Sequence, residues 1–265
     1  MLHGRGTEGH TDVARDDELG SAPMNLLLLR DSDFRSNRNA RISDQRVDHI
    51  RKILRLSKGD ELRVGLLGGR IGTAWITEIR PGRLDVEVAE LDTEPPPRLP
   101  IELVLAVPRP KFIGRILQTV ACFGIEKLTL LHSARVEKSY WQSSVLEPES
   151  IERHFRLGLE QGCDTHPPAI ELRRSFRNFV TEELPDRLAA RPGLLAAQSS
   201  PVPFPRQVAL PHLLIVGPEG GFLEQEVSAI SDAGVTTGSL GERTLRVEVA
   251  VTACLSRCLP DPRPH

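Results

Sequence analysis

The chain has 265 residues and an ordinary globular composition: 39% of the residues are hydrophobic, 26% are charged, and the formal net charge at pH 7 is -2. This length allows one large domain or two modest ones, with enough residues for a substantial core. There is no run of about 18 apolar residues, which excludes a membrane-spanning helix. A net charge close to zero also argues against a surface that is covered by nucleic acid throughout.

The first 23 residues are polar and charged, contain glycines, and include no apolar segment of the kind that a secretory signal requires. We therefore expect residues 1–23 to be a disordered extension and the ordered protein to begin at Met24. The four cysteines are widely spaced and form no Cys-x-x-Cys pair, so we expect no metal site. Without a secretion signal, a reducing cytoplasm is the simplest location.

The segment after Met24 predicts a small β-barrel. Residues 25–30 are expected to form a strand, and residues 43–56 a helix with Ser43 as its N-cap, because apolar residues recur there at helical spacing. Three alternating strands follow, separated by tight glycine turns. Several short strands joined by tight turns are typical of a barrel. The expected strands cover residues 61–64, 71–79 and 83–89.

Positive charge is concentrated in this same segment. Between Arg30 and Arg70, eleven Lys or Arg residues stand against six Asp or Glu residues, an excess of five positive charges. Such an excess favours a surface that faces RNA phosphates, with Arg51 and Arg55 as the candidate RNA-binding residues. An ordinary solvated surface is the alternative, since acidic residues are interspersed.

The chain changes character after residues 94–100, which include four prolines and predict a stiff linker. We place the domain boundary between residues 97 and 98. Beyond it, predicted strands and helices alternate, which implies an α/β fold with a mostly parallel sheet and helices on both faces. The expected strands cover residues 101–107, 127–131, 194–197 and 213–216, and the expected helices cover residues 114–123, 147–161, 223–233 and 244–259.

Two glycine loops near the C-terminus are the most informative motifs. The first contains Gly217, Pro218, Glu219, Gly220 and Gly221 after an apolar strand. It matches neither the G-x-G-x-x-G fingerprint nor a phosphate loop, and a strand-end glycine loop suits a nucleoside-like ligand without phosphates. Taken alone it is equally well an ordinary connection between a strand and a helix. A second loop of the same kind, over residues 239–246, suggests one shared pocket.

These motifs resemble the RsmE-type methyltransferases of the SPOUT superfamily. Both loops carry the resemblance, the first followed by Glu226 and the second, Leu-Gly-Glu-Arg-Thr-Leu-Arg over residues 240–246, by Glu248. Residues 48–60 are similar to the helix and turn that enter the family's PUA-like RNA-binding barrel. The resemblance implies a PUA-like domain over residues 24–97, a SPOUT domain with a C-terminal trefoil knot over residues 98–265, and methylation of N3 of a uridine in 16S ribosomal RNA.

The resemblance also implies the ligands and partners. S-adenosylmethionine is expected to bind in the knot. The protein is expected to be a homodimer that acts on the small ribosomal subunit, without a role for DNA or a membrane. The residues that match the family's cofactor loops are Gly217, Pro218, Glu219, Gly220, Gly221, Leu240, Gly241 and Leu245.

Arg246 and Glu248 are the candidate catalytic residues. Uracil N3 carries a proton that must leave during methyl transfer, and a permanently charged guanidinium can stabilise the resulting anion. An ion pair of Arg246 with Glu242 or Glu248 is the structural alternative, and Glu248 is expected to orient Arg246 more than to accept the proton. Val249 stands where the family pattern has threonine, so the chain departs from that pattern beside the two candidate catalytic residues.

Arg109 and Lys111 follow the first strand of the second domain and are candidates for gripping the RNA backbone. Tyr140 and Trp141 are candidates for stacking on a base, with packing against a helix as the alternative. Two other functions stay open: methylation of another RNA, such as tRNA or large-subunit rRNA, and a role as a non-catalytic RNA-binding assembly factor.

Overall fold

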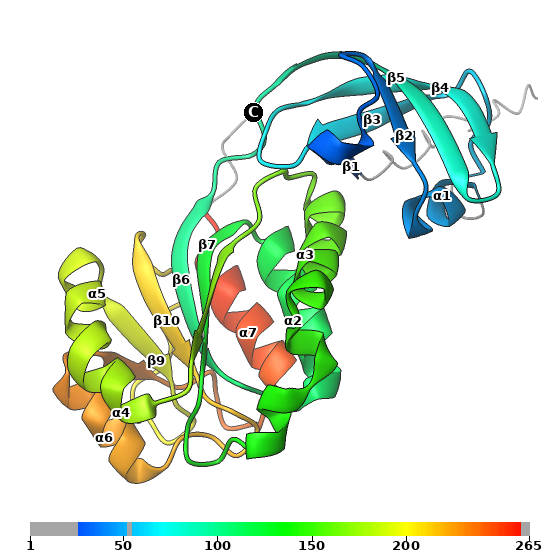
Figure 1. Ribbon diagram of the computed structural model, residues 1–265. Helices are drawn as coiled ribbons and strands as arrows, with labels where there is room; N and C mark the ends of the chain where they lie inside the picture. Colours follow the sequence, from blue (N-terminus) through cyan, green and yellow to red (C-terminus); the bar gives the residue numbers. More distant parts are fainter. Residues whose placement is uncertain (1–25, 52–54, 261–265) are drawn as a thin grey trace, which may run out of the picture.

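The computed structural model describes residues 26–51 and 55–260, which form two sheets; a long helix, α3, packs on one face of the second sheet, and its C-terminal end reaches the first (Figure 1). The expected disordered extension at residues 1–23 and the start at Met24 lie outside the described residues. Within the described residues, no helix is long and apolar enough to cross a membrane.

The first sheet has five strands in the order β1-β3-β4-β5-β2, and alternate residues point into its own core. β1 pairs with β3 in parallel, whereas the other pairs are antiparallel. The sheet curls, but β1 and β2 remain its two edges, so it is an open sheet and not a closed barrel. Its strands are β1 Leu27–Leu29, β2 Asn39–Ile42, β3 Glu61–Leu66, β4 Ile71–Arg80 and β5 Arg83–Thr93.

The helix expected over residues 43–56 is shorter in the structure. α1 spans Gln45–His49, and its N-cap is Asp44, not Ser43, because the Asp44 carboxylate accepts a hydrogen bond from the Arg46 amide. Residues 52–54 lie outside the described residues. Arg55 has a φ of 54°, which is incompatible with continued right-handed helix.

The second sheet has six strands in the order β11-β9-β10-β6-β7-β8, and every pair is parallel, as the alternating pattern predicts. Its central strand β6 is almost entirely buried, which is typical of a parallel sheet covered on both faces. The strands are β6 Leu99–Ala106, β7 Ile125–Leu131, β8 Ala169–Arg173, β9 Gly193–Ala196, β10 His212–Val216 and β11 Thr236–Gly238.

Helices cover both faces of this sheet. Alternate residues of β6 belong to different cores: Leu103 packs with α2, α3 and α7, whereas Val104 packs with the helices of the opposite face. The first group is α2 Pro110–Cys122, α3 Pro148–Gly162 and α7 Val247–Ser256. The second group is α4 Phe176–Asn178, the π-helical turn η5 Phe179–Glu183, α5 Leu184–Ala190 and α6 Glu224–Asp232. The short 3-10 turns η1 Asp31–Asp33, η3 Lys138–Gln142 and η4 Ser144–Leu146 complete the described elements.

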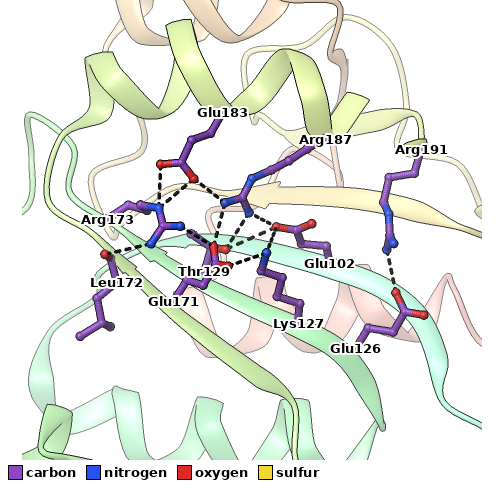
Figure 2. Close-up of polar contacts among 10 residues, drawn as sticks. All are labelled: Glu102, Glu126, Lys127, Thr129, Glu171, Leu172, Arg173, Glu183, Arg187 and Arg191. Carbon is purple, nitrogen blue, oxygen red and sulfur yellow. Dashed lines mark hydrogen bonds and ion pairs between the residues drawn. The ribbon is translucent and has the colours of Figure 1, made fainter. Parts of the chain in front are cut away.

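Polar contacts attach α5 to the sheet (Figure 2). Arg187 of α5 forms ion pairs with Glu102 of β6, Glu171 of β8 and Glu183 of η5. Glu171 also pairs with Lys127 of β7 at 2.7 Å. The sequence does not predict β8, α4, η5 or α5, because charged residues stand where an amphipathic pattern would place apolar ones.

The two sheets are joined by direct hydrogen bonds around the C-terminal part of α3. The Leu26 amide donates to the carbonyl of Glu160 at 3.1 Å, and the Gly68 amide donates to the carbonyl of Thr165 at 2.8 Å. The Thr165 hydroxyl in turn donates to the carbonyl of Gly69 at 2.5 Å. The five-stranded sheet therefore lies at the end of α3 that is opposite to the carboxyl ends of β6 and β10 (Figure 1).

Candidate functional site

A cavity of about 610 Å³ lies at the carboxyl ends of β9 and β10. Both glycine loops line it, which confirms that they share one pocket. Parallel sheets place loops from several strands together at this edge, and such an edge is the usual ligand site of an α/β fold. All eight residues selected as cofactor-binding line the cavity: Gly217, Pro218, Glu219, Gly220, Gly221, Leu240, Gly241 and Leu245.

The first loop presents its backbone to the cavity. Gly221 has a φ of 68°, a conformation that side chains rarely adopt, and a Cβ atom built there would meet nothing within 4 Å. Gly217 is closely packed, because a Cβ atom there would lie 3.2 Å from Phe222. Glycine is thus needed at Gly221 for backbone conformation and at Gly217 for space.

The second loop is held by a residue that the sequence does not single out. The side-chain amide of Gln198 donates to the carbonyl of Glu242 at 3.1 Å and to the hydroxyl of Thr244 at 3.2 Å. Gln198 and Ser199 also line the cavity as a third wall after β9. Their position directly after the predicted strand 194–197 is the only sequence signal for this role.

Arg246 lies at the mouth of this cavity. It is the N-cap of α7 and is exposed, and its neighbours Leu245 and Val247 both line the cavity. Its guanidinium makes no hydrogen bond or ion pair within residues 26–51 and 55–260, so the alternative pairing with Glu242 or Glu248 is not found there. The charge of Arg246 is therefore available to a ligand.

Glu248 lies in the first turn of α7 and is only 9% exposed. Its Oε2 atom is buried and has no hydrogen-bond partner among the described residues. No contact joins its carboxylate to Arg246 in that part of the chain, and Glu248 is not one of the residues that line the cavity. Leaving a buried carboxylate oxygen unpaired is costly, which marks Glu248 for a role beyond packing.

Glu219 connects the first loop to the candidate RNA-binding residues. Its Oε1 atom accepts a hydrogen bond of 2.9 Å from the backbone amide of Arg109, the N-cap of α2. The Arg109 side chain is exposed, as is that of Lys111 two residues later, whose Nζ atom lies 4.9 Å from the Phe112 ring. Both cations are therefore next to the cavity edge.

Arg51 and Arg55 lie between α1 and β3 in the chain, and both of these elements belong to the five-stranded sheet region, away from the carboxyl ends of β9 and β10 (Figure 1). Arg51 lies 3.7 Å from Asp48. Five arginines of the basic segment form ion pairs, namely Arg30, Arg41, Arg46, Arg51 and Arg70. Five exposed cations of the segment have no ion pair within the described residues, namely Arg35, Arg38, Arg55, Lys58 and Arg63. Fewer cations of this segment are thus unpaired, within the described residues, than the charge count suggests.

The two aromatic candidates have different settings. Trp141 is buried, and its indole nitrogen donates to Nδ1 of His132 at 2.9 Å, so the packing alternative holds for Trp141. Tyr140 is half-buried, and its hydroxyl donates to Glu137 at 3.0 Å. Only Tyr140 retains surface for contact with a base.

The chain matches two family models. One, described as an RNA methyltransferase domain, covers residues 94–259, and the other, described as an RNA methyltransferase PUA domain, covers residues 42–89. The chain is thus an RNA methyltransferase with a PUA domain.

Two named relatives indicate which family of RNA methyltransferases the chain belongs to. Ribosomal RNA small subunit methyltransferase E of Treponema pallidum is 30% identical over 79% of this chain and 80% of the relative. Ribosomal RNA small subunit methyltransferase E 1 of Borreliella burgdorferi is 26% identical over 87% and 95%. The chain therefore belongs to the RsmE-type family of RNA methyltransferases.

A solved structure has the same fold. Ribosomal RNA small subunit methyltransferase E of Neisseria gonorrhoeae, bound to S-adenosyl methionine, matches with a TM-score of 0.66 and 20% identity, over 88% of this chain and 95% of that one.

Proposed function

We propose that this protein uses S-adenosylmethionine to methylate N3 of a specific uridine in the 16S rRNA of the small ribosomal subunit. The observation that carries the proposal is the single cavity that both glycine loops line at the carboxyl edge of the sheet. The relatives named as small subunit methyltransferases support the substrate, and the S-adenosyl methionine in the Neisseria gonorrhoeae structure supports the methyl donor.

The residues of the cavity fit S-adenosylmethionine. Gly221 and Gly241, with φ values of 68° and 127°, leave the main chain open to a purine and a ribose, and Leu240 adds an apolar wall. The first loop has no Lys-Ser/Thr after its glycines, which agrees with a nucleoside cofactor that has no phosphates. When bound, this cofactor supplies an electrophilic methyl group on a sulfonium.

Arg246 is the residue to which we assign stabilisation of the uracil anion. The N3 proton must leave before or during methyl transfer, and negative charge then develops on the base oxygens. The guanidinium at the cavity mouth, which has no ion pair within the described residues, can donate to one of those oxygens. Alignment of donor and acceptor in the cavity contributes the rest of the rate.

Glu248 is proposed as the residue that orients Arg246 when RNA is bound. It lies two residues beyond Arg246 in the first turn of α7, and its Oε2 atom retains an unused acceptor position. Because Glu248 does not line the cavity, direct contact with the base is the less favourable assignment.

RNA binding is assigned to two regions. Arg109 and Lys111 lie beside the cavity edge, where they can bind phosphates that flank the target base. Arg51 and Arg55 lie in the PUA-like region. We propose that this region comprises residues 24–97 and that the methyltransferase domain comprises residues 98–265. The separation of the two regions in one chain favours an extended RNA substrate.

We also infer a trefoil knot over the C-terminal part of the chain. Residues 197–208 hydrogen-bond to the segment after β11 and to the end of α7: the Phe204 amide donates to Ser239, and the Val208 amide donates to Arg257. β10 then enters the sheet between β9 and β6, although it follows both in sequence. These contacts hold residues 197–208 against the C-terminal segment that a knot would thread, which supports the knot that the family resemblance implies.

A homodimer is the proposed assembly. Leu245, Val249 and Leu259 are exposed apolar residues on or beside α7, with 36%, 46% and 49% exposure. A second copy that packs against α7 would cover them and lie next to Arg246. Sedimentation analysis of the wild type and of Val249→Arg tests this, with a dimer expected for the first and a monomer for the second.

The substrate is tested with ribosomal subunits from cells that lack this gene. Purified protein and methyl-labelled S-adenosylmethionine should label 16S rRNA in small subunits, and primer extension should stop at one uridine, because an N3 methyl group blocks Watson-Crick pairing. Parallel reactions with tRNA and large subunits test the alternative substrates. If tRNA or large-subunit rRNA is labelled and 16S rRNA is not, the proposed substrate is wrong and the labelled RNA is the substrate.

A further inference from the structure

Glu226 is a buried carboxylate beside the cavity, and its two oxygens bind amide groups of two different loops. Oε2 accepts a hydrogen bond of 2.9 Å from the Leu223 amide, directly after the first glycine loop. Oε1 accepts one of 2.8 Å from the Ala134 amide, 92 residues away and just after β7. Glu226 is 5% exposed and is not one of the residues that line the cavity.

These two hydrogen bonds connect loops whose strands are not neighbours. β6 lies between β10 and β7 in the sheet, so Glu226 links the loop after β10 to the loop after β7. The Arg135 guanidinium reinforces the same link by donating to the carbonyl of Gly220. Through Glu219, the glycine loop also binds the Arg109 amide after β6.

The glycine loop needs such support because it presents main-chain atoms to the cavity. Glycine backbones populate many conformations, so an unsupported loop would have to be ordered at the moment of binding, which weakens affinity. Charge-assisted hydrogen bonds from a buried carboxylate are among the stronger means of preventing this. Among the three side chains that hold the loop, Glu226 alone is buried.

We propose that Glu226 is a positioning residue that holds residues 217–223 in the conformation that receives the cofactor. This inference rests on the proposed function of the cavity. It concerns how the loop is held and not which atoms touch the ligand. Glu226 therefore affects affinity for S-adenosylmethionine and leaves the chemistry of the bound complex unchanged.

Glu226→Gln tests the proposal, because it keeps the size of the side chain but places an NH2 group against one of the two amide donors. We expect the Kd and the KM for S-adenosylmethionine to rise about tenfold, the loss that follows from one charge-assisted hydrogen bond. The kcat at saturating S-adenosylmethionine should stay within about twofold of wild type, since the loop is then filled. Glu224→Gln is the matched control: it removes an exposed carboxylate from the same helical turn and should change neither constant.

The outcomes separate three explanations. An unchanged Kd overturns the proposal, and so does a loss of binding sites at unchanged Kd, which would indicate partial unfolding only. A wild type that does not bind S-adenosylmethionine refutes the proposed function itself. If Glu226→Gln fails to fold, Arg135→Met is the second variant, because it removes the other hydrogen bond between the two loops from the exposed side. It should raise the Kd for S-adenosylmethionine roughly threefold, the loss expected of one exposed hydrogen bond. An unchanged Kd in Arg135→Met then overturns the proposal.

Discussion

Arg46 in the five-stranded sheet and Arg246 at the cavity mouth are arginines in opposite settings. Arg46 is 4% exposed, and its guanidinium binds Asp33, Asp44 and the carbonyl of Leu28. Burial alone would lower its pKa, but the hydrogen bonds to Asp44 and Asp33 raise it above its usual value. Arg246 is exposed and has no ion pair within the described residues. The buried Arg46 is neutralised by carboxylates of its own domain, whereas Arg246 is left for a ligand.

The largest expected effect comes from breaking the Arg46 cluster. Arg46→Met should cost about 3–5 kcal/mol of unfolding free energy, because Asp33 and Asp44 would keep their charges without the cation. Urea unfolding measures this loss. Arg63→Met, at an exposed arginine of the same sheet, is the control and should change stability by less than about 0.5 kcal/mol. A comparable loss in both variants would contradict a special contribution of the buried Arg46 ion pairs to stability.

Arg246→Ala should keep its stability but lose activity, in contrast to Arg46→Met. Its stability should stay within about 0.5 kcal/mol of wild type, because the side chain is exposed and has no hydrogen bond or ion pair within the described residues. Methyl transfer should fall about 100- to 1000-fold, as for loss of one donor to a developing anion, with little change in cofactor affinity. Calorimetry and single-turnover transfer separate the two quantities, and Arg206→Ala serves as an exposed-arginine control. Equal losses of binding and transfer would move Arg246 from catalysis to cofactor binding.

Arg109→Ala and Lys111→Ala should each weaken RNA binding by about 1 kcal/mol and reduce the salt dependence of binding by about one counterion. Cofactor affinity should be retained, because the backbone amide of Arg109, and not its side chain, holds Glu219. Filter binding at several salt concentrations measures both quantities. A salt dependence identical to wild type would place the RNA phosphates elsewhere.

The smallest expected effect concerns pH and the junction of the two sheets. Burial raises the pKa of the Glu160 carboxyl above its ordinary value of 4.5, although Arg156 opposes this. A carboxyl with a raised pKa stabilises the fold most below its ordinary pKa, and this contribution is lost as the pH rises through the raised value. The unfolding free energy of wild type relative to Glu160→Gln should therefore decline as the pH rises above the ordinary pKa of 4.5. A difference that is flat or that increases would contradict the assignment.

Most of the second domain is predictable from sequence because its strands and helices are strongly apolar. The predicted strand 213–216 corresponds to β10 His212–Val216, and the predicted helix 223–233 to α6 Glu224–Asp232. α2 begins at Pro110, four residues before the predicted start, although proline in the first turn of a helix is a usable signal. The helix predicted over residues 244–259 begins only at Val247, because residues 244–246 belong to the second loop.

The parts that the sequence does not predict depend on polar contacts. β8 and α5 carry charged residues toward each other, and only the folded chain brings Arg187 beside Glu102 and Glu171 (Figure 2). β2 alternates polar and apolar residues, but it is an edge strand of only four residues, too short for the alternation to stand out in the sequence. Amphipathic periodicity detects burial against an apolar core, so it gives no signal where an element is held by ion pairs between charged side chains.

The sequence by itself determines the α/β class, the family and the two glycine loops, because backbone flexibility and apolar periodicity are local properties of the chain. It also places Arg246 at the end of the second loop. Only the tertiary structure decides which charges remain free, that Gln198 forms a third wall, and that Glu226 joins two loops 92 residues apart. Those outcomes depend on long-range hydrogen bonds, whose partners meet only when the parallel sheet brings its strand ends to one edge.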